Sequence, residues 1–174
     1  MDDHQLAERA LFELAEQVGT ALKMRVMMLA TAESCTGGWV GEAVTAVPGS
    51  SNWFDRGFIT YTNEAKQEML GVSAATLEQH GAVSEQTVRE MVSGALSNSR
   101  GQAALAISGI AGPGGGTPEK PVGTVWFAWG FAKGAVTCER RYFSGDRREV
   151  RRQAVECGLQ GLLERLKGGC DGQD

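Results

Sequence analysis

The chain has 174 residues, a hydrophobic content of 42% and a formal net charge of -4 at pH 7. These values suit one well-packed domain over residues 1–174, with 1–3 and 168–174 expected as mobile tails. The acidic balance argues against a nucleic-acid surface, which needs clustered Lys and Arg. Because no apolar run approaches the ~20 residues of a membrane span and the N-terminus is acidic, we expect a cytoplasmic protein that does not enter a membrane.

The apolar pattern of the first part of the chain predicts a helix, a strand and a second helix. Apolar residues recur at helical intervals over 4–22, and the apolar run 25–30 predicts a strand buried on both faces. The polar segment 31–38 leads into small and apolar residues over 39–47, which favour a helix packed against that strand. Residues 56–62 alternate and are rich in aromatic and branched side chains, which predicts a second strand.

The middle of the chain predicts a helical insert. Asn63, Ser73 and Ser84 can each cap the N-terminus of a helix, and glycines at 71 and 81 end the first two. The third helix is expected to run to Asn98.

The last part of the chain predicts three strands and a long helix. Residues 102–110 form a buried apolar run, and the glycine- and proline-rich segment 111–118 follows it. Residues 122–131 and 135–143 flank a short glycine-containing loop, which indicates an antiparallel hairpin before an amphipathic helix over 147–167. Together the elements predict the α/β class: a three-layer α/β/α sandwich around a mixed, mostly parallel sheet with a late antiparallel hairpin.

Three polar segments follow predicted strands, at the edge where α/β sheets bind ligands. They are 33–38, 60–63 with Lys66 one helical turn further on, and 108–117. In the first, 33–38, Ser34 lies between a strand and a helix, where the amides of Thr36, Gly37 and Gly38 could hold an oxyanion. The simpler interpretation is that Ser34 or Thr36 only caps the helix.

A serine nucleophile needs a base, and the two histidines offer little. His4 is near the terminus and His80 stands beside a glycine. Lys66 could serve if burial lowered its pKa, with Tyr61 relaying or orienting the proton. Taken singly, Lys66 would be a solvated lysine and Tyr61 a half-buried strand residue.

Two segments could bind an anion. Backbone amides after Ser108, including Gly109 and Gly112, can wrap a phosphate or carboxylate, although the segment could equally be a long mobile connection. Arg147 lies at the start of the last helix and could hold a phosphate with help from the helix dipole. The same role is open to Arg148, but a solvated helix face is the favoured interpretation for the arginines at 148, 151 and 152.

The sequence resembles the CinA C-terminal family over nearly its whole length. The resemblance rests on E-S-C-T-G-G, P-G-S-S, I-T-Y-T-N-E-A-K, G-A-V-S, S-G-I-A-G-P-G-G-G-T-P-E-K-P-V-G-T-V and F-S-G-D-R-x-x-V-R, in that order. It implies Ser34 as nucleophile, Lys66 as base and Tyr61 as its partner. It also implies Ser51 and Ser108 as polar site residues, and an arginine of G-D-R-R as a substrate contact.

For activity, the resemblance implies hydrolysis of nicotinamide mononucleotide to nicotinic acid mononucleotide and ammonia, in recycling of NAD. It implies no cofactor, and the scattered cysteines and histidines predict no metal site. The expected partner is this small molecule, and the sequence leaves homo-oligomer formation open. The alternative is a non-catalytic nucleotide-binding or interaction module linked to competence or DNA-damage responses.

Overall fold

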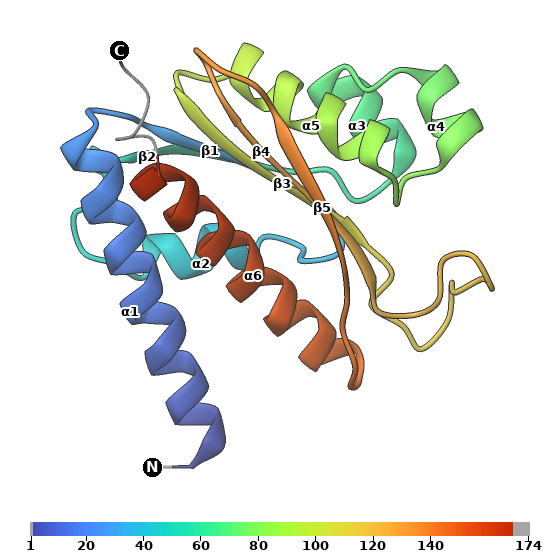
Figure 1. Cartoon of the computed structure of the whole chain (residues 1–174), viewed down its shortest axis with the longest axis horizontal. Coiled ribbons are helices and arrows are strands. Elements are labelled where there is room, and N and C mark those ends of the chain that lie inside the picture. Colours follow the sequence, from blue (N-terminus) through green and yellow to red (C-terminus); the bar gives the residue numbers. More distant parts are fainter. Residues whose placement is uncertain (1, 169–174) are drawn as a thin grey trace.

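A five-stranded sheet forms the centre of the computed structural model, which describes residues 2–168 (Figure 1). The strands are β1 (Leu29–Glu33), β2 (Phe54–Ile59), β3 (Ala103–Gly109), β4 (Thr124–Phe131) and β5 (Thr137–Tyr142). The helices are α1 (Asp3–Met24), α2 (Trp39–Thr45), α3 (Asn63–Leu70), α4 (Ala74–His80), α5 (Glu85–Ser97) and α6 (Arg147–Gly168), with a 3-10 turn over Ser50–Asn52.

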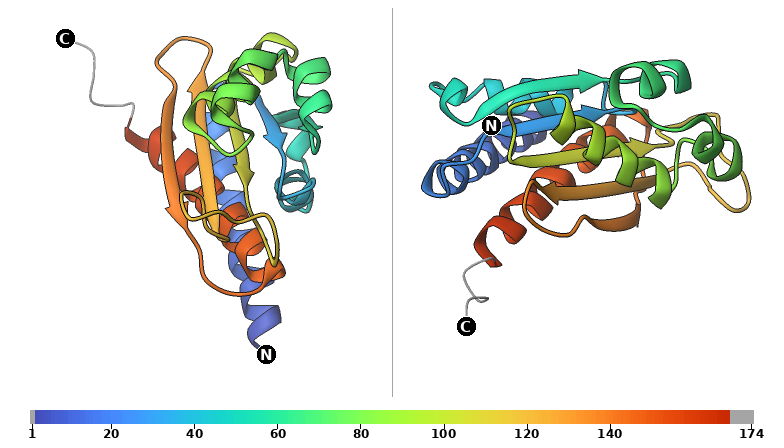
Figure 2. Two further views of the ribbon diagram at one scale, coloured as in Figure 1. Left: turned by 90° about the vertical axis from the view of Figure 1, so that its right-hand side faces the viewer. Right: turned by 90° about the horizontal axis from the view of Figure 1, so that it is seen from above.

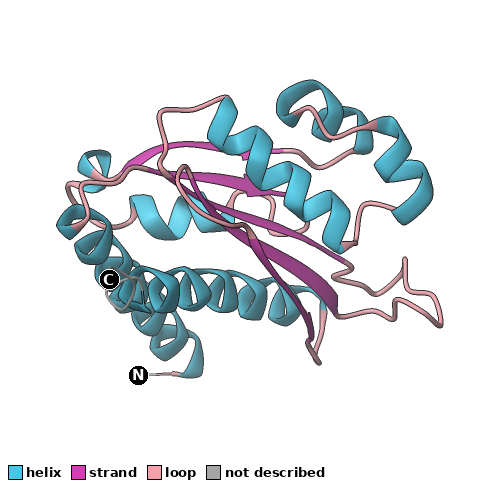
Figure 3. Ribbon diagram, turned by 45° about the horizontal axis from the view of Figure 1, so that its top comes forward, coloured by secondary structure: helices cyan, strands magenta, loops and turns pink. Residues whose placement is uncertain are grey.

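Helices cover both faces of the sheet, as Figures 2 and 3 show. α1, α2 and α6 pack on one face, and α3, α4 and α5 pack on the other. The predicted three-layer α/β/α sandwich is therefore confirmed. Within residues 2–168, no helix combines the length and the apolar character that a membrane crossing requires.

The strand order is β2-β1-β3-β4-β5. β1 pairs in parallel with β2 and β3, whereas β4 is antiparallel to both β3 and β5. The mixed sheet and the late hairpin are thus confirmed. The parallel strands end together, so the segments after β1, β2 and β3 meet at one edge of the sheet, the carboxyl edge.

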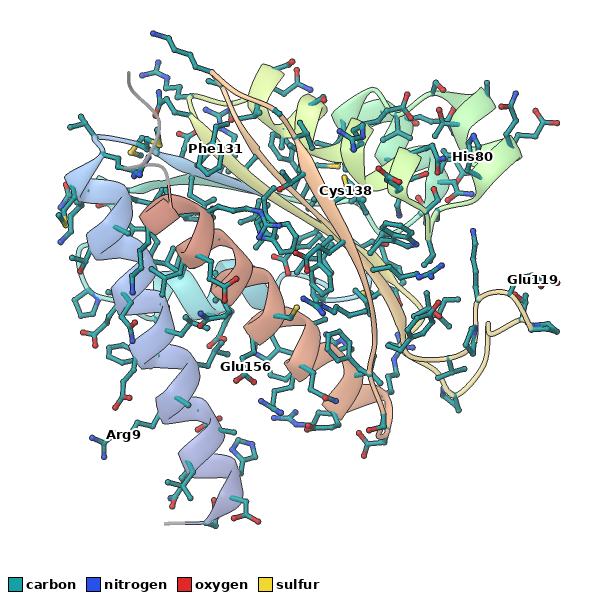
Figure 4. The ribbon with its side chains drawn as sticks, in the orientation of Figure 1. Arg9, His80, Glu119, Phe131, Cys138 and Glu156 are labelled. Carbon is teal, nitrogen blue, oxygen red and sulfur yellow. The ribbon has the colours of Figure 1, made fainter. Side chains whose placement is uncertain are left out.

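Alternation along β3 divides the core into two. Leu105 and Ile107 face the α6 side, in a cluster with Phe127 and Trp129. Small side chains, including Ala104 and Ala106, face α5 and pack with its apolar residues. Figure 4 shows the same division at the sheet's outer strand, where Cys138 points toward the α5 side. Both faces of β3 are buried, as its continuous apolar run predicts.

Several boundaries differ from the predictions. β1 begins at Leu29 rather than Arg25, because α1 extends to Met24 and the chain turns at Val26, where φ is 55° and the side chain is 89% exposed. An apolar run does not reveal which of its residues pair with a neighbouring strand. The cap of α3 is Thr62, and Asn63 is its first helical residue.

The predicted caps of α4 and α5 are confirmed, whereas neither Ser34 nor Thr36 caps α2, whose cap position is Gly38. Ser73 and Ser84 accept hydrogen bonds from amides in the first turns of α4 and α5, and Asp146 accepts one from the Glu149 amide in α6. At the N-terminus, Asp2 caps α1, which begins at Asp3. Most of the predicted C-terminal tail, 169–174, lies outside the described residues, and Gly168 ends α6.

Candidate active site

Ser34 is the first residue after β1, at the carboxyl edge of the sheet. Its amide donates to the carbonyl of Ile107 on β3, and its carbonyl accepts from the amide of Gly37, which closes a turn over 34–37. These two contacts fix the backbone on both sides of the side chain. The residue is buried, with 7% of its surface exposed.

Lys66 reaches Ser34 from α3. Its amine Nζ lies 2.8 Å from the Ser34 Oγ, and only 1% of the residue is exposed. α3 is held in place by Thr62, whose hydroxyl accepts from the amide of Ala65. A side chain that would be solvated on an isolated helix is therefore buried against the end of β1.

The surroundings of the Lys66 amine shift it toward its neutral form. Burial lowers the pKa of Lys66 to about 8 from its ordinary value of 10.5, and no carboxylate forms an ion pair with it within residues 2–168. The carbonyls of Thr60 and Tyr61 lie 2.8 and 3.4 Å from Nζ. They can accept the two N–H groups of a neutral amine, which leaves its lone pair for the Ser34 hydroxyl.

The buried carboxylate of Glu33 holds the turn after Ser34. It accepts from the Thr36 hydroxyl at 2.7 Å and from the amides of Val40 and Gly41 at 2.8 and 3.1 Å. It therefore satisfies the first amides of α2, where a negative charge is also favourable to the helix dipole. Sequence analysis missed this role, although a Glu three residues before Thr36 is a usable signal.

The amides proposed as oxyanion donors fall into two groups. The Gly37 amide is already engaged by the Ser34 carbonyl, so this part of the prediction does not fit the structure. Within residues 2–168, the amides of Cys35, Thr36 and Gly38 have no protein acceptor. Gly38 has a φ of 101°, a conformation that favours glycine and that lets the chain enter α2.

Arg151 on α6 also binds this turn. Its guanidinium donates to the carbonyls of Cys35 at 3.0 Å and Thr36 at 3.1 Å. The sequence interpretation placed Arg151 on a solvated face, and the structure corrects it. The available signal was its spacing, since residues 147 and 151 share one face of a helix.

Tyr61 is placed differently from its predicted role. Its side chain is exposed, and its hydroxyl accepts a hydrogen bond from Arg147 at 2.8 Å. Only its main-chain carbonyl contacts Lys66. Arg147 also donates to the carbonyl of Gly112 at 2.8 Å, so it joins Tyr61 to the glycine-rich loop.

Arg148 points to a different part of the surface. Its guanidinium lies 3.1 Å from the His4 ring nitrogen and 5.4 Å from the centre of the Trp39 ring. It lines an open groove of about 1300 Å³ between α1, α2 and α6. Thr36, Gly37 and Gly38 also line that groove, whereas Ser34 and Lys66 do not. Arg147 instead contacts Tyr61 and Gly112.

The hydroxyl of Ser108 lies on the strand beside Ser34 but is engaged elsewhere. It donates to the carbonyl of Ala82 at 2.8 Å, in the loop before α5. Gly109 ends β3, where a Cβ would lie 2.9 Å from the Thr124 carbonyl and 2.7 Å from Val125. This backbone therefore packs closely against β4.

Two further polar residues, Ser51 and Thr60, lie on either side of β2. Ser51 does not join the cluster, because it precedes β2 and so lies at the opposite edge, where β2 pairs with the start of β1. Thr60, which sequence analysis did not select, follows β2 at the carboxyl edge. Its buried hydroxyl has no hydrogen-bond partner within residues 2–168. Figure 4 shows His80 at the end of α4 and Glu119 on the projecting glycine-rich loop.

In this α/β/α sandwich, the Ser34 hydroxyl and the Lys66 amine are paired at the carboxyl edge of the sheet. The chain belongs to the family described as "CinA C-terminal domain", whose sequence model matches residues 11–166.

Similar proteins span nearly the whole chain. "Nicotinamide-nucleotide amidohydrolase PncC" of Escherichia coli (strain K12) is 56% identical over 161 residues, which cover 92% of this chain and 98% of that protein. The protein of the same name from Pseudomonas putida is 52% identical and covers 87% of this chain and 94% of its own length. A crystal structure of the competence/damage inducible protein CihA from Agrobacterium tumefaciens has a TM-score of 0.86 and 47% identity, covering 90% of this chain and 95% of that one.

Proposed function

We propose that this chain hydrolyses the carboxamide of nicotinamide mononucleotide to nicotinic acid mononucleotide and ammonia, in the recycling of NAD. The names of relatives more than 50% identical over nearly their full lengths support the reaction class and the substrate. The observation that carries the chemistry is the 2.8 Å contact between the Ser34 hydroxyl and the buried amine of Lys66.

In the first half of the proposed reaction, Ser34 is the nucleophile. Neutral Lys66 takes the hydroxyl proton while Oγ attacks the carboxamide carbon, and the carbonyl oxygen becomes an oxyanion. The unengaged amides after Ser34 would stabilise that oxyanion. The Lys66 ammonium then gives its proton to the departing nitrogen, the C–N bond breaks, and ammonia leaves an acyl-enzyme on Ser34.

In the second half, water hydrolyses the acyl-enzyme. Lys66, neutral again, takes a proton from water while the water oxygen attacks the ester carbon. The C–O bond to Ser34 then breaks, and the proton returns to Oγ. The positive pyridinium ring withdraws electrons from the carbonyl carbon in both halves.

The remaining site residues would bind the substrate. Arg147 carries the positive charge suited to the phosphate, next to Tyr61 and the glycine-rich loop with Gly109 and Gly112. We propose that Tyr61 contacts the substrate, because its hydroxyl accepts a hydrogen bond from Arg147 and does not contact the Lys66 amine. Ser108, on the strand next to that of Ser34, would be a polar contact for the substrate.

Purified protein should release ammonia from nicotinamide mononucleotide in the presence of a metal chelator, and nicotinic acid mononucleotide should appear in equal amount. A coupled ammonia assay with chromatography of the nucleotides measures both products. Binding of the nucleotide in a thermal-shift assay without turnover would contradict the hydrolase and favour a non-catalytic binding module.

The turnover rate should rise with pH and level off above about 8, because the proposed base must be neutral and burial lowers the pKa of Lys66 to about 8. Well below that value, kcat should fall roughly tenfold per pH unit. Replacing the two histidines at 4 and 80 with asparagine should leave this fall of kcat at low pH unchanged. If the fall disappeared in that variant, the titrating group would be an imidazole instead.

A further inference from the structure

We propose that Arg151 is a positioning residue that turns the amide of Thr36 toward the oxyanion formed at Ser34. The inference rests on the proposed function and extends it, because it names the residue that orients an oxyanion donor. Its basis is the pair of hydrogen bonds from the Arg151 guanidinium to the carbonyls of Cys35 and Thr36.

The geometry of the peptide bond relates these hydrogen bonds to the direction of the Thr36 amide. The Cys35 carbonyl and the Thr36 N–H belong to one planar trans peptide, so the two groups point in opposite directions. Arg151 lies on α6, which packs on one face of the sheet, and Lys66 reaches Ser34 from α3 on the other face. With its carbonyl held toward α6, this peptide presents the Thr36 N–H toward the side of Ser34 and Lys66.

The contact differs from an ordinary helix cap. The first amides of α2 are satisfied by the Glu33 carboxylate, whereas Arg151 binds carbonyls in the turn that precedes the helix. The Thr36 carbonyl also accepts from the Trp39 amide, but within residues 2–168 the Cys35 carbonyl has Arg151 as its only partner. Arg151 therefore adds to the 34–37 turn the one hydrogen bond that, in the described part of the chain, holds the Cys35 carbonyl.

The guanidinium itself is held in place. It lies 5.5 Å from the centre of the Trp39 ring, and it borders the open groove between α1, α2 and α6. It also lies close to Gly37, where a Cβ would be 3.4 Å from an Arg151 nitrogen, an ordinary contact distance. The planar fork of an arginine suits two adjacent carbonyls better than the single amine of a lysine.

Arg151→Ala should lower kcat about 10- to 100-fold with little change in KM, because an oxyanion donor acts mainly in the transition state. The limb of the pH profile near 8 should stay, since the Ser34 and Lys66 pair is untouched. Arg151→Lys should keep part of the rate. The matched control is Arg152→Ala, which removes the neighbouring arginine and its ion pairs with Glu149 and Glu156 and should turn over as wild type does.

Two further measurements separate positioning from general support of the fold. Free guanidinium ion, at concentrations well below those that unfold the protein, should restore part of the rate of Arg151→Ala through the open groove. A fluorophosphonate probe should label Ser34 more slowly in Arg151→Ala than in Arg152→Ala, because its phosphoryl oxygen uses the same donor. This second readout does not require the natural substrate.

The outcomes distinguish this inference from the proposed function. Wild-type kcat in Arg151→Ala, a raised KM as the main change, or a lost rate that guanidinium does not restore would overturn the positioning role. If the wild-type protein is labelled but releases no ammonia, slow labelling of Arg151→Ala would support the positioning role of Arg151. The same result would overturn nicotinamide mononucleotide as the substrate. A Ser34 that neither labels nor turns over substrate would overturn both.

Discussion

Ser34→Ala will abolish ammonia release from nicotinamide mononucleotide while the domain stays folded. Without the hydroxyl there is no acyl-enzyme, and kcat should fall at least about a thousandfold, because a nucleophile and its base act as one unit. The substitution removes one small polar atom from a buried site, so the fold should tolerate it. Ammonia release and circular dichroism, measured on the same preparation, test both statements.

Ser51→Ala is the matched control for this variant. It also removes a serine hydroxyl, but at the opposite edge of the sheet, and it should retain nearly the wild-type rate. Near-normal turnover by Ser34→Ala would eliminate the acyl-enzyme mechanism, whatever the control does.

Lys66→Met will lower kcat by about 10²- to 10⁴-fold, the usual contribution of a general base. Methionine keeps most of the apolar stem and removes the amine, so the variant should fold and still bind the nucleotide. Lys23→Met, on the exposed face of α1, provides the control and should be fully active. Ammonia release together with a thermal-shift titration separates lost chemistry from lost binding. Turnover within a few-fold of wild type would remove Lys66 from the mechanism.

The same variant tests the depressed pKa of Lys66 without any substrate. The folded-state pKa of about 8 lies below the ordinary 10.5, so between these values the unfolded chain binds more protons than the folded one. Wild-type stability should gain a contribution as pH rises through this window, and lose it as pH falls toward 8. Denaturant unfolding at a series of pH values should show that gain in wild type and its absence in Lys66→Met.

Local patterns predicted the architecture because each pattern reflects packing. The continuous apolar run of β3 marks a strand buried on both faces, and the serines at 73 and 84 mark helix starts. The predicted start of β1 was wrong because the apolar residues from 26 to 28 have the composition of a strand. Pairing with the start of β2, a long-range contact, decides where the strand begins.

The site was predictable in part. Ser34 and Lys66 were selected from a junction and a family motif, and the structure brings their side chains together. The direction of the Tyr61 hydroxyl was not predictable, because its partner Arg147 lies 86 residues away in the sequence. Arg151 was missed because its spacing from Arg147 indicates only a shared helix face, and the carbonyls it binds lie 116 and 115 residues away in the sequence.

The distribution of these groups along the chain has a consequence for synthesis and for fragments. Lys66 follows Ser34 by 32 residues, but Arg151 follows Cys35 by 116, in the last helix. A nascent chain that ends before α6 contains the serine and the lysine without the arginine that holds their turn. Truncated products that lack α6 should therefore release ammonia more slowly than the full chain.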